Sequence, residues 1–566
     1  MNRDKELYRE LRSLSWHDLW THEVPRFNAA DPKTRFRRVA VIRAVAVVFT
    51  ESGAAADLTA VKRWLRSLLS DPEEKIRRYA IAALPKLPRE TDDEQQLLAL
   101  TKTSSSIREQ KHLASALGKI GGAETLRQSE SLPLPTIQRV KAGLTRSENP
   151  SAINFDSPLA NPQNIEILLH CRAGLEKILN DEVTEFLCDH KQFGLRETKT
   201  ALVMLSAKAA FTLTDLLKLR CFDTLGFSLG TTRGSTIVSI SDVASSRTSR
   251  RILETFTDGP LRYRLDFVSR GHQRAAVREL ATLIYKNSPD LLNGGGDTPW
   301  TFEIHSTDRA HRLELVPKII PDPRFAYRRR YIPAASHPPL AACMARLSLK
   351  SSNAWEGERL CEPFPSASSH FPPASKSKSS SPNSASHVNP RSNRRAEILT
   401  SRLPIGAGNT ATQEIIWDPF CGSGLELIER SLLGGVKKII GTDLSPEALQ
   451  IAQQNFAAAN LTDIESEFLV SDFRNFDPGP VSLIITNPPL GRRVPIPNLA
   501  QLIADLFETA ARHLVPGGQL IFVNPVNIAP RSSALQRALS QLVDFGGFHC
   551  LLEKYILTDR KPAPSH

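Results

Sequence analysis

Residues 414–435, "EIIWDPFCGSGLELIERSLLGG", decide the fold of the C-terminal part of this 566-residue chain. A short apolar run ends at Asp418, a glycine-rich turn follows, and the next residues have the apolar spacing of a helix. The same order recurs in "VKKIIGTDLSPEALQIAQQNFAAANL", and further strand-like runs follow in "ESEFLVSDF", "PVSLIITNPP" and "PGGQLIFVNP". Strands that alternate with helices through short turns predict a parallel, doubly wound α/β sheet.

The ends of these strands carry the residues expected to bind a ligand. In a doubly wound sheet, ligands lie beyond the carboxyl ends of the strands, at the switch point beside the first strand. Gly422 and Gly424 allow the backbone to pass close to a ligand where a Cβ would collide. Asp443 ends the second strand, where a carboxylate can accept both hydroxyls of a ribose. Asp472 ends the third strand, where it can accept a hydrogen bond from an adenine amino group.

The glycine turn does not suit a dinucleotide. Such a site requires the pattern G-x-G-x-x-G with the pyrophosphate on the helix N-terminus. Here Leu427 stands at the third glycine position, and Glu426 places a bulky carboxylate inside the turn.

The motifs "DPFCGSG", "GTDLSPEAL", "SDF" and "TNPP", at the ends of successive strands, together resemble those of Rossmann-like S-adenosylmethionine methyltransferases. An unrelated nucleotide-binding fold is the alternative. The resemblance implies S-adenosyl-L-methionine as the cofactor and no metal. The cofactor-binding positions that it implies are Asp418, Phe420, Cys421, Gly422, Ser423, Gly424, Asp443, Leu444, Asp472 and Phe473.

The stretch "TNPPLG", residues 486–491, follows the fourth strand and predicts the chemistry. Methyltransferases that modify an exocyclic base amine carry an Asn/Asp/Ser-Pro-Pro-aromatic motif at this place. Such an amine is a poor nucleophile because its lone pair is delocalised into the ring. The Asn487 side-chain oxygen and the Pro488 carbonyl can each accept one N–H, which aligns the nitrogen and localises its lone pair. A purely structural interpretation of Asn-Pro-Pro, as a rigid turn that ends a strand, is the alternative.

Two positions depart from the family pattern. Leu490 stands where an aromatic ring normally stacks on a flipped-out base, and Leu425 replaces the threonine of "DPxCGSGT". Pro489 and Leu490 are nevertheless expected to contact the target base. After "GGQLIFVNP", only "FHCLLEKYIL" has the pattern of a strand, although this fold normally closes with an antiparallel pair.

The N-terminal region contains an internal repeat. "DPKTRFRRVAVIRAVAVV" begins at Asp31 and "DPEEKIRRYAIAALPKLP" at Asp71, with a weaker third copy in "TSSSIREQKHLASALGKIG". A period of about forty residues with helical spacing resembles HEAT-type repeats, which offer a binding surface to a partner such as a protein. A plain helical domain with chance similarity is the alternative. The arginine pairs Arg37–Arg38 and Arg77–Arg78 are available for RNA or for a solvated helix face.

The middle of the chain alternates strand-like and helix-like segments. The phrases "CRAGLEKILNDE" and "LRCFDTLGFSL" resemble the THUMP domain of RNA methyltransferases, which grips structured RNA; an unrelated α+β domain is the alternative. The next segment, "RFAYRRRYIPAASHPPLAACMARLSLK", interleaves arginines with aromatic residues, a pattern suited to phosphate contact and base stacking. Arg324, Arg328 and Tyr331 are its expected RNA contacts, although a basic surface turn before a packing helix fits the same pattern.

Six segments are therefore expected. They are residues 1–125, HEAT-like helical repeats; 126–160, a linker; 161–320, a THUMP-like α+β region; 321–350, a basic connector and helix; 351–396, a Ser/Pro-rich insertion too poor in apolar residues to fold; and 397–566, the α/β Rossmann-like methyltransferase domain.

Composition narrows the class of protein. The 72 lysines and arginines against 60 acidic residues give a net charge of +12, which is compatible with a polyanionic partner. Seven scattered cysteines without a C-x-x-C pair indicate neither a disulfide framework nor a zinc site. Without a signal-peptide core or an apolar run of about 18 residues, we expect a cytoplasmic protein with no membrane contact.

Taken together, residues 160–566 resemble the THUMP-containing guanine-N2 methyltransferases of tRNA and rRNA. The resemblance implies methylation of an exocyclic amine in structured RNA. Two alternatives stay open: an adenine-N6 DNA methyltransferase, and a non-catalytic RNA-binding or ribosome-assembly scaffold with a degenerate methyltransferase domain.

Overall fold

The computed structural model describes residues 3–53, 55–128, 132–133, 136–137, 140, 149–234, 236–269, 271, 273–295, 298–307, 309–330, 332, 336–349, 413–491 and 496–558. The expected insertion at 351–396 and Tyr331 lie outside these residues. The chain divides into two compact units, with a boundary between residues 150 and 151. Among the described residues, no helix is long and apolar enough to span a membrane.

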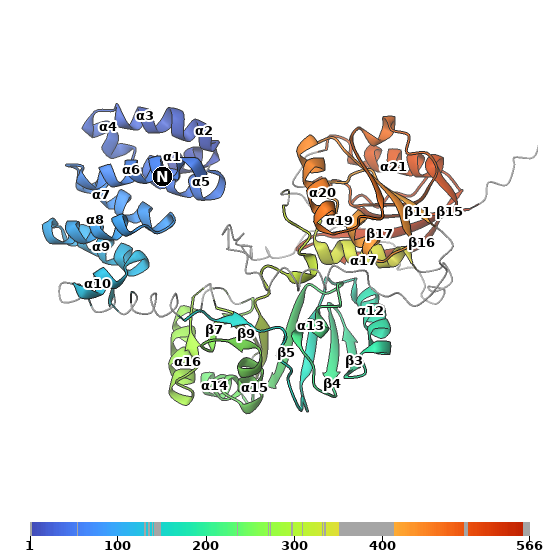
Figure 1. Ribbon diagram of the computed structural model, residues 1–566, viewed down its shortest axis with the longest axis horizontal. Coiled ribbons are helices and arrows are strands. Elements are labelled where there is room, and N and C mark those ends of the chain that lie inside the picture. Colours follow the sequence, from blue (N-terminus) through green and yellow to red (C-terminus); the bar gives the residue numbers. More distant parts are fainter. Residues whose placement is uncertain are drawn as a thin grey trace, which may run out of the picture. The chain divides into compact units, whose positions relative to one another are not determined.

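The first unit is helical (Figure 1). Its helices are α1 (Arg3–Ser13), α2 (Trp16–Asp18), α3 (Val24–Asn28), α4 (Pro32–Arg37), α5 (Ala40–Ser52), α6 (Leu58–Ser67), α7 (Glu74–Ala83), α8 (Thr91–Thr103), α9 (Ile107–Ile120) and α10 (Ala123–Arg127). The second repeat has a buried apolar face, with Ile76 and Ala80 of α7 and the following Leu84 in one hydrophobic cluster. The helical class is thus confirmed, whereas the assignment to HEAT repeats stays a prediction.

Three of the four arginines in the repeated Arg-Arg pairs have carboxylate partners. Arg77 donates two hydrogen bonds to the buried Glu109, at 2.6 and 3.1 Å, and Arg38 pairs with Glu23. Arg78 pairs with Glu74 on its own helix. Each of these three arginines therefore has a carboxylate partner, and their contact with RNA stays a prediction.

The second unit begins with an eight-stranded sheet in the order β3-β4-β2-β5-β10-β9-β7-β8. The strands are β2 (Glu166–His170), β3 (Phe193–Lys199), β4 (Leu202–Ala207), β5 (Thr224–Thr231), β7 (Arg262–Phe267), β8 (Leu292–Asn293), β9 (Trp300–Ser306) and β10 (His311–Pro317), with the short pair β1 (Ala152–Ile153) and β6 (Thr257–Asp258) outside it. The accompanying helices are α12 (Glu176–Asp189), α13 (Leu213–Leu216), α14 (Ile237–Ala244), α15 (Arg247–Thr255) and α16 (Arg274–Asn287).

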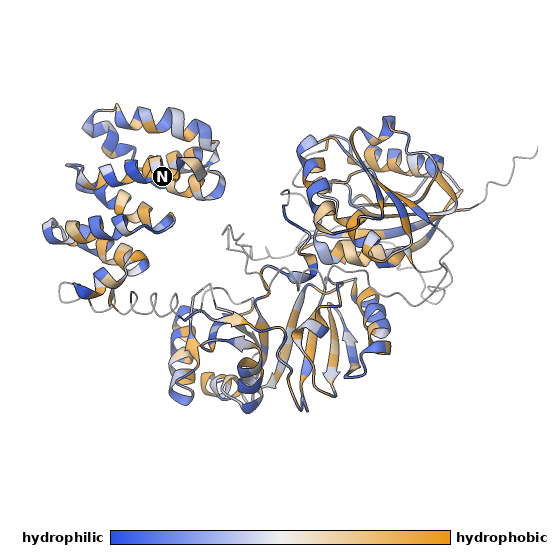
Figure 2. Cartoon of the chain, in the orientation of Figure 1, coloured by the Kyte–Doolittle hydropathy of each residue, from blue (hydrophilic) through white to orange (hydrophobic). Residues whose placement is uncertain are grey.

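Hydrophobic residues follow the strands of this sheet, whereas α12 and α16 mix hydrophobic and hydrophilic positions (Figure 2). That amphipathic pattern is typical of helices that cover one face of a sheet.

The second sheet of this unit has seven strands in the order β13-β12-β11-β14-β15-β17-β16. They are β11 (Glu414–Asp418), β12 (Val436–Asp443), β13 (Glu465–Val470), β14 (Val481–Thr486), β15 (Leu514–Asn524), β16 (Leu535–Asp544) and β17 (His549–Leu557). The helices α19 (Leu425–Leu432), α20 (Pro446–Ala458) and α21 (Leu499–His513) connect the parallel strands. The predicted doubly wound sheet is confirmed, with its first strand β11 between β12 and β14.

The expectation of a single closing strand is wrong. Residues 535–544 form β16, which pairs antiparallel with β17 from Leu535↔Leu557 to Asp544↔His549. The segment has apolar residues at helix-like spacing, but a bulge between Arg537 and Leu539 shifts its register. Pairing along a formed strand edge overrides the local pattern here.

The two sheets of this unit share one hydrophobic cluster. Helix α17 (Pro338–Ser348) lies in it with every described apolar side chain from Pro338 to Leu347 buried. A helix that is apolar on all sides requires protein around it, which explains the composition "PPLAACMARLS". A buried ion pair joins the same regions, since Arg220 donates from Nε and Nη2 to Glu429 of α19, both at 2.8 Å.

Candidate functional site

Four parallel strands bring the expected residues to one edge of the second sheet. Asp418, Asp443 and Asn487 follow or end β11, β12 and β14, which are neighbours in the order β12-β11-β14. Asp472 follows β13 on the far side of β12. Because the carboxyl ends of parallel strands share one edge, the predicted site residues gather there.

The glycine turn after β11 is held by the carboxylate at the end of β12. Gly422 has φ +52° and donates its N–H to Asp443 Oδ2 at 2.9 Å, while Ser445 N–H donates to Oδ1 at 2.9 Å. Gly424 has φ +80°, and a Cβ there would lie 3.1 Å from the Ala452 Cβ. Both glycines are therefore required by backbone conformation, and Gly424 also by the close approach of α20.

The environment of Asp418 suits a cationic group. Its Oδ1 accepts hydrogen bonds from Thr486 Oγ1 at 2.6 Å and from Phe420 N at 3.0 Å, whereas its Oδ2 is buried and has no partner among the described residues. Burial and the nearby charge of Glu426 raise the pKa of Asp418 well above its usual range. A buried acceptor without a donor costs about 1–3 kcal/mol, so the turn fits the ammonium of an amino-acid moiety such as that of S-adenosylmethionine.

The rest of the cofactor edge has a polar and an apolar part. The Ser423 hydroxyl in the turn is also buried, with no hydrogen-bond partner in the described part of the chain. Leu444, directly after Asp443, has an apolar side chain that is 70% exposed, which suits contact with the flat face of an adenine. Asp443 would hold the ribose of the cofactor and Leu444 would contact its adenine, and the cofactor would supply the methyl group.

Three expected cofactor residues have other roles in this structure. The Cys421 thiol is buried, and burial raises its pKa well above its usual range, so it is no nucleophile. Phe473 is buried, and the centroid of its ring lies 4.9 Å from the centroid of the Phe420 ring. Asp472 accepts hydrogen bonds from the Arg474 guanidinium at 2.6 and 2.9 Å, which an adenine amino group would have to share.

Asn487 follows β14 in a defined orientation. Its Nδ2 donates to Ser336 Oγ at 2.8 Å, whereas its Oδ1 is buried and accepts no hydrogen bond from any described residue. Pro488 is buried, and Pro489 is partly buried. Leu490 packs partly buried against the hydrophobic cluster of the second unit. This oxygen is the one expected to accept an amine hydrogen. Because no described residue donates to it, a ligand that displaces the atoms covering it can donate a hydrogen bond there.

The connector before α17 passes over the glycine turn. Asn455 of α20 accepts hydrogen bonds at Oδ1 from the backbone N–H groups of Arg329 and Arg330, at 2.9 and 3.3 Å. Its Nδ2 donates to the carbonyls of Arg330 and Ser423, both at 3.1 Å. Sequence reasoning missed Asn455, although asparagine inside a helix is an unfavourable residue that often signals such a contact.

The expected exposure of Arg324 is wrong. Its side chain is 1% exposed, pairs with Asp322 at 2.7 Å and donates to the Phe222 carbonyl at 2.9 Å. The guanidinium lies 3.8 Å from the Phe222 ring centroid. Arg324 therefore joins the connector to the first sheet of this unit and has no free surface for RNA. Arg328 is half-buried, whereas Arg329 and Arg330 are exposed.

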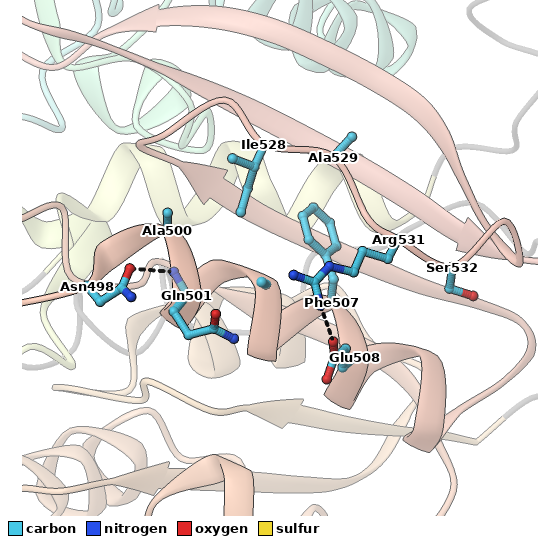
Figure 3. Close-up of a pocket in the computed structure, with 10 residues that line it drawn as sticks. Asn498, Ala500, Gln501, Phe507, Glu508, Ile528, Ala529, Arg531 and Ser532 are labelled. Atoms are coloured by element: carbon cyan, nitrogen blue, oxygen red, sulfur yellow. Dashed lines mark hydrogen bonds and ion pairs between the residues drawn. The ribbon is translucent and has the colours of Figure 1, made fainter.

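Two other features lie apart from the strand ends that carry the site. A depression of about 310 Å³ lies between α21 and residues 528–532, and its lining contains none of the expected site residues (Figure 3). On β9 and β10, Glu303, His305 and Glu314 come within 4.8 Å of one another. Arg312 and His170 already pair with Glu314, at 2.9 and 2.8 Å, which leaves this carboxylate neutralised by the protein.

Comparison with known proteins agrees with this geometry. Residues 405–553 match the family described as "RMKL-like, methyltransferase domain". Over 207 residues, the chain is 27% identical to the ribosomal RNA large subunit methyltransferase K/L of Shewanella frigidimarina; the match covers 28% of this chain and 28% of that protein.

Solved structures similar to this one include TrmN from Thermus thermophilus, at 17% identity, 70% coverage of this chain, 100% coverage of that chain and a TM-score of 0.46. A possible methylase from Clostridium difficile has 14% identity, coverages of 71% and 99%, and a TM-score of 0.42.

The family match falls on β11 to β17 and contains the turn, the acidic strand ends and the Asn-Pro-Pro stretch described above. Residues 405–553 therefore match the methyltransferase domain of the RMKL-like family, whose cofactor is S-adenosylmethionine.

Proposed function

We propose that this protein transfers a methyl group from S-adenosylmethionine to guanine N2 in structured RNA, either tRNA or rRNA. The observation that carries the proposal is the Asn487 amide oxygen, which is buried at the end of β14 with no donor among the described residues. Asn487 Oδ1 and the Pro488 carbonyl would each accept one amine hydrogen and hold the nitrogen lone pair toward the methyl group. Alignment and fixed dipoles of this kind need no covalent intermediate.

The RNA part of the proposal rests on the connector. Arg329 and Arg330 are exposed, while their backbone atoms are fixed to Asn455 beside the glycine turn. Their guanidinium groups are thus held near the methyl-transfer site on an anchored backbone. Arginine suits phosphate contact because it offers several donors in a planar fork. The net charge of +12 and the similarity to a ribosomal RNA methyltransferase support the same substrate class.

The central sheet is proposed to bind RNA as a THUMP-like region. Its helices and strands from β2 to β10 form the mixed α+β region in which the THUMP-like phrases lie, and it packs against the catalytic domain through α17. The helical first unit is proposed to form HEAT-like repeats that bind a protein partner.

The test measures transfer of a labelled methyl group to bulk tRNA, bulk rRNA and DNA. We expect label in RNA, with N2-methylguanine as the product identified by mass spectrometry. Asn487→Ala should abolish transfer while cofactor affinity measured by calorimetry stays within about two-fold, because the amide contacts only the base. Label in DNA alone, as N6-methyladenine, would replace this proposal with an adenine-N6 DNA methyltransferase.

Leu490 favours a second candidate, an RNA-binding or ribosome-assembly scaffold with a degenerate catalytic domain. Its side chain packs against the protein core and offers no aromatic face to a base. Cofactor binding separates the two candidates. Tight binding that Asp443→Ala abolishes supports the enzyme, whereas absence of binding in the intact protein supports the scaffold.

A further inference from the structure

We propose that Ser336 and Glu426 are positioning residues that determine which end of the Asn487 amide faces the reacting amine. We call the hydrogen-bonded chain Asn487–Ser336–Glu426 the relay. Its catalytic role rests on the proposed function, whereas the direction of its hydrogen bonds is a property of the structure alone. None of the motifs that define the methyltransferase contains Ser336.

The relay connects three separate parts of the chain. Ser336 lies just before α17, Glu426 is the second residue of α19, and Asn487 follows β14. The Ser336 hydroxyl donates to Glu426 Oε1, and Asn487 Nδ2 donates to Ser336 Oγ at 2.8 Å across 151 residues of sequence. Glu426 is 3% exposed, so water does not compete for its carboxylate.

The direction of the relay follows from the number of hydrogens. A serine hydroxyl has one hydrogen to donate and lone pairs to accept with. Because an ionised Glu426 only accepts, Ser336 donates to it and can therefore only accept from Asn487. The NH₂ group of Asn487 is then held toward Ser336, and its oxygen is held away from Ser336, where none of the described residues donates to it.

Glu426 lies among other buried acids. Burial raises the pKa of Glu426, and the hydrogen bond from Ser336 offsets part of that rise. The carboxylates facing Glu426 are Asp418 and Glu429. Glu429 is neutralised by Arg220 at 2.8 Å, and the pKa of Asp418 lies well above its usual range. The Ser336 hydroxyl donates to Glu426, which is the arrangement that an ionised Glu426 imposes.

A reversed amide would oppose the reaction. If Glu426 carried the proton, it could donate to Ser336, and the serine hydrogen would be free to bond Asn487 Oδ1. The NH₂ group would then face the amine of the base, and two hydrogen-bond donors would point at each other without an acceptor. The relay thus links one buried charge to the orientation of the acceptor on which amine methylation depends.

Thermal unfolding of the wild type, Glu426→Gln, Asn487→Asp and the double variant forms a cycle that tests the direction without any activity measurement. In Asn487→Asp, one serine hydrogen faces two carboxylates, and we expect the Tm to fall by about 2–4 °C. In Asn487→Asp with Glu426→Gln, the glutamine NH₂ donates to Ser336 and the serine donates to the carboxylate introduced at position 487, so most of the loss should be recovered. Asn487→Ala with Glu426→Gln is the matched control, in which no recovery is expected because alanine accepts nothing.

Strictly additive shifts of Glu426→Gln and Asn487→Asp would overturn the relay. This outcome differs from failure of the proposed function, because the cycle reads stability in a protein whether or not it methylates RNA.

The kinetic test compares Ser336→Ala with Ser336→Thr. Loss of the hydroxyl should lower kcat on the order of 100-fold with cofactor affinity unchanged, whereas threonine retains the hydroxyl and should restore most of kcat. Equal kcat values for Ser336→Ala and the wild type would contradict the positioning role. If wild-type protein methylated no RNA while the stability cycle still showed recovery, the proposed function would fail and the relay would stand.

Discussion

Arg220→Met should loosen the attachment of the methyltransferase domain to the central sheet. Arg220 is 3% exposed and donates to both oxygens of Glu429 at 2.8 Å, and the Tyr327 hydroxyl donates to the same carboxylate at 2.5 Å. Methionine keeps most of the apolar stem but leaves Glu429 as a buried charge with only a neutral donor. Breaking a buried pair in this way costs about 3–5 kcal/mol.

Hydrogen exchange of the full-length protein, followed by mass spectrometry, measures this loss locally. Peptides from α19 and from residues 218–222 should exchange faster by roughly two to three and a half orders of magnitude, since each 1.4 kcal/mol is a factor of about ten. The matched control is Arg250→Met on α15. Its pairs with Asp290 and Glu254 are exposed, and their loss should cost less than about 1 kcal/mol.

A compensated variant separates charge from packing. Combining Arg220→Met with Glu429→Met and Tyr327→Phe removes the guanidinium, the carboxylate and the hydroxyl together, and most of the protection should return. If Arg220→Met exchanged no faster than Arg250→Met, the buried pair would not hold the two regions together, and the reasoning from burial would be refuted.

Three further predictions concern the site and the helical unit. Leu490→Phe should raise methyl transfer or leave it level, because base stacking contributes about 1–3 kcal/mol per base; loss of activity would contradict guanine as the target. In the pH range where Asp418 is protonated in the free protein, S-adenosylmethionine binding should release protons from Asp418, because an adjacent ammonium lowers its raised pKa. Calorimetry in buffers of different protonation enthalpy measures this release. It should vanish in Asp418→Asn, and also at pH values where Asp418 has the same charge in the cofactor-free and the cofactor-bound protein. In the helical unit, Arg77→Met should lower the Tm because it leaves Glu109 buried without its main cation, and an unchanged Tm would contradict that role.

Much of the methyltransferase domain was predictable from its sequence. Apolar runs that end in Asp418, Asp443 and Thr486 are strands β11, β12 and β14, and the turns that follow them carry the expected site residues. Ser445 caps α20 by accepting the Ala448 N–H at 3.2 Å, as its place before a proline predicts. These features depend on residues close together in the chain, so periodicity and turn chemistry reveal them.

The relay and the connector contacts depend on the tertiary structure. Ser336 and Asn487 are 151 residues apart, and Asn455 and Arg330 are 125 apart. No local pattern records which distant side chain will be the partner. The same reason explains Arg324, where the sequence predicted a basic surface and the structure places a buried guanidinium against Asp322 and Phe222.

The parallel sheet, the glycine turn and the acidic strand ends follow from the sequence, because each depends on neighbouring residues. The strand at residues 535–544 and the orientation of the Asn487 amide follow from the tertiary structure. The strand forms because β17 offers a free edge. The amide orientation depends on the single hydroxyl hydrogen of Ser336, whose two partners lie on elements that meet only in the folded chain. Strand pairing and buried hydrogen bonds depend on the residues of other elements that face them in the folded protein, and the local sequence does not identify those residues.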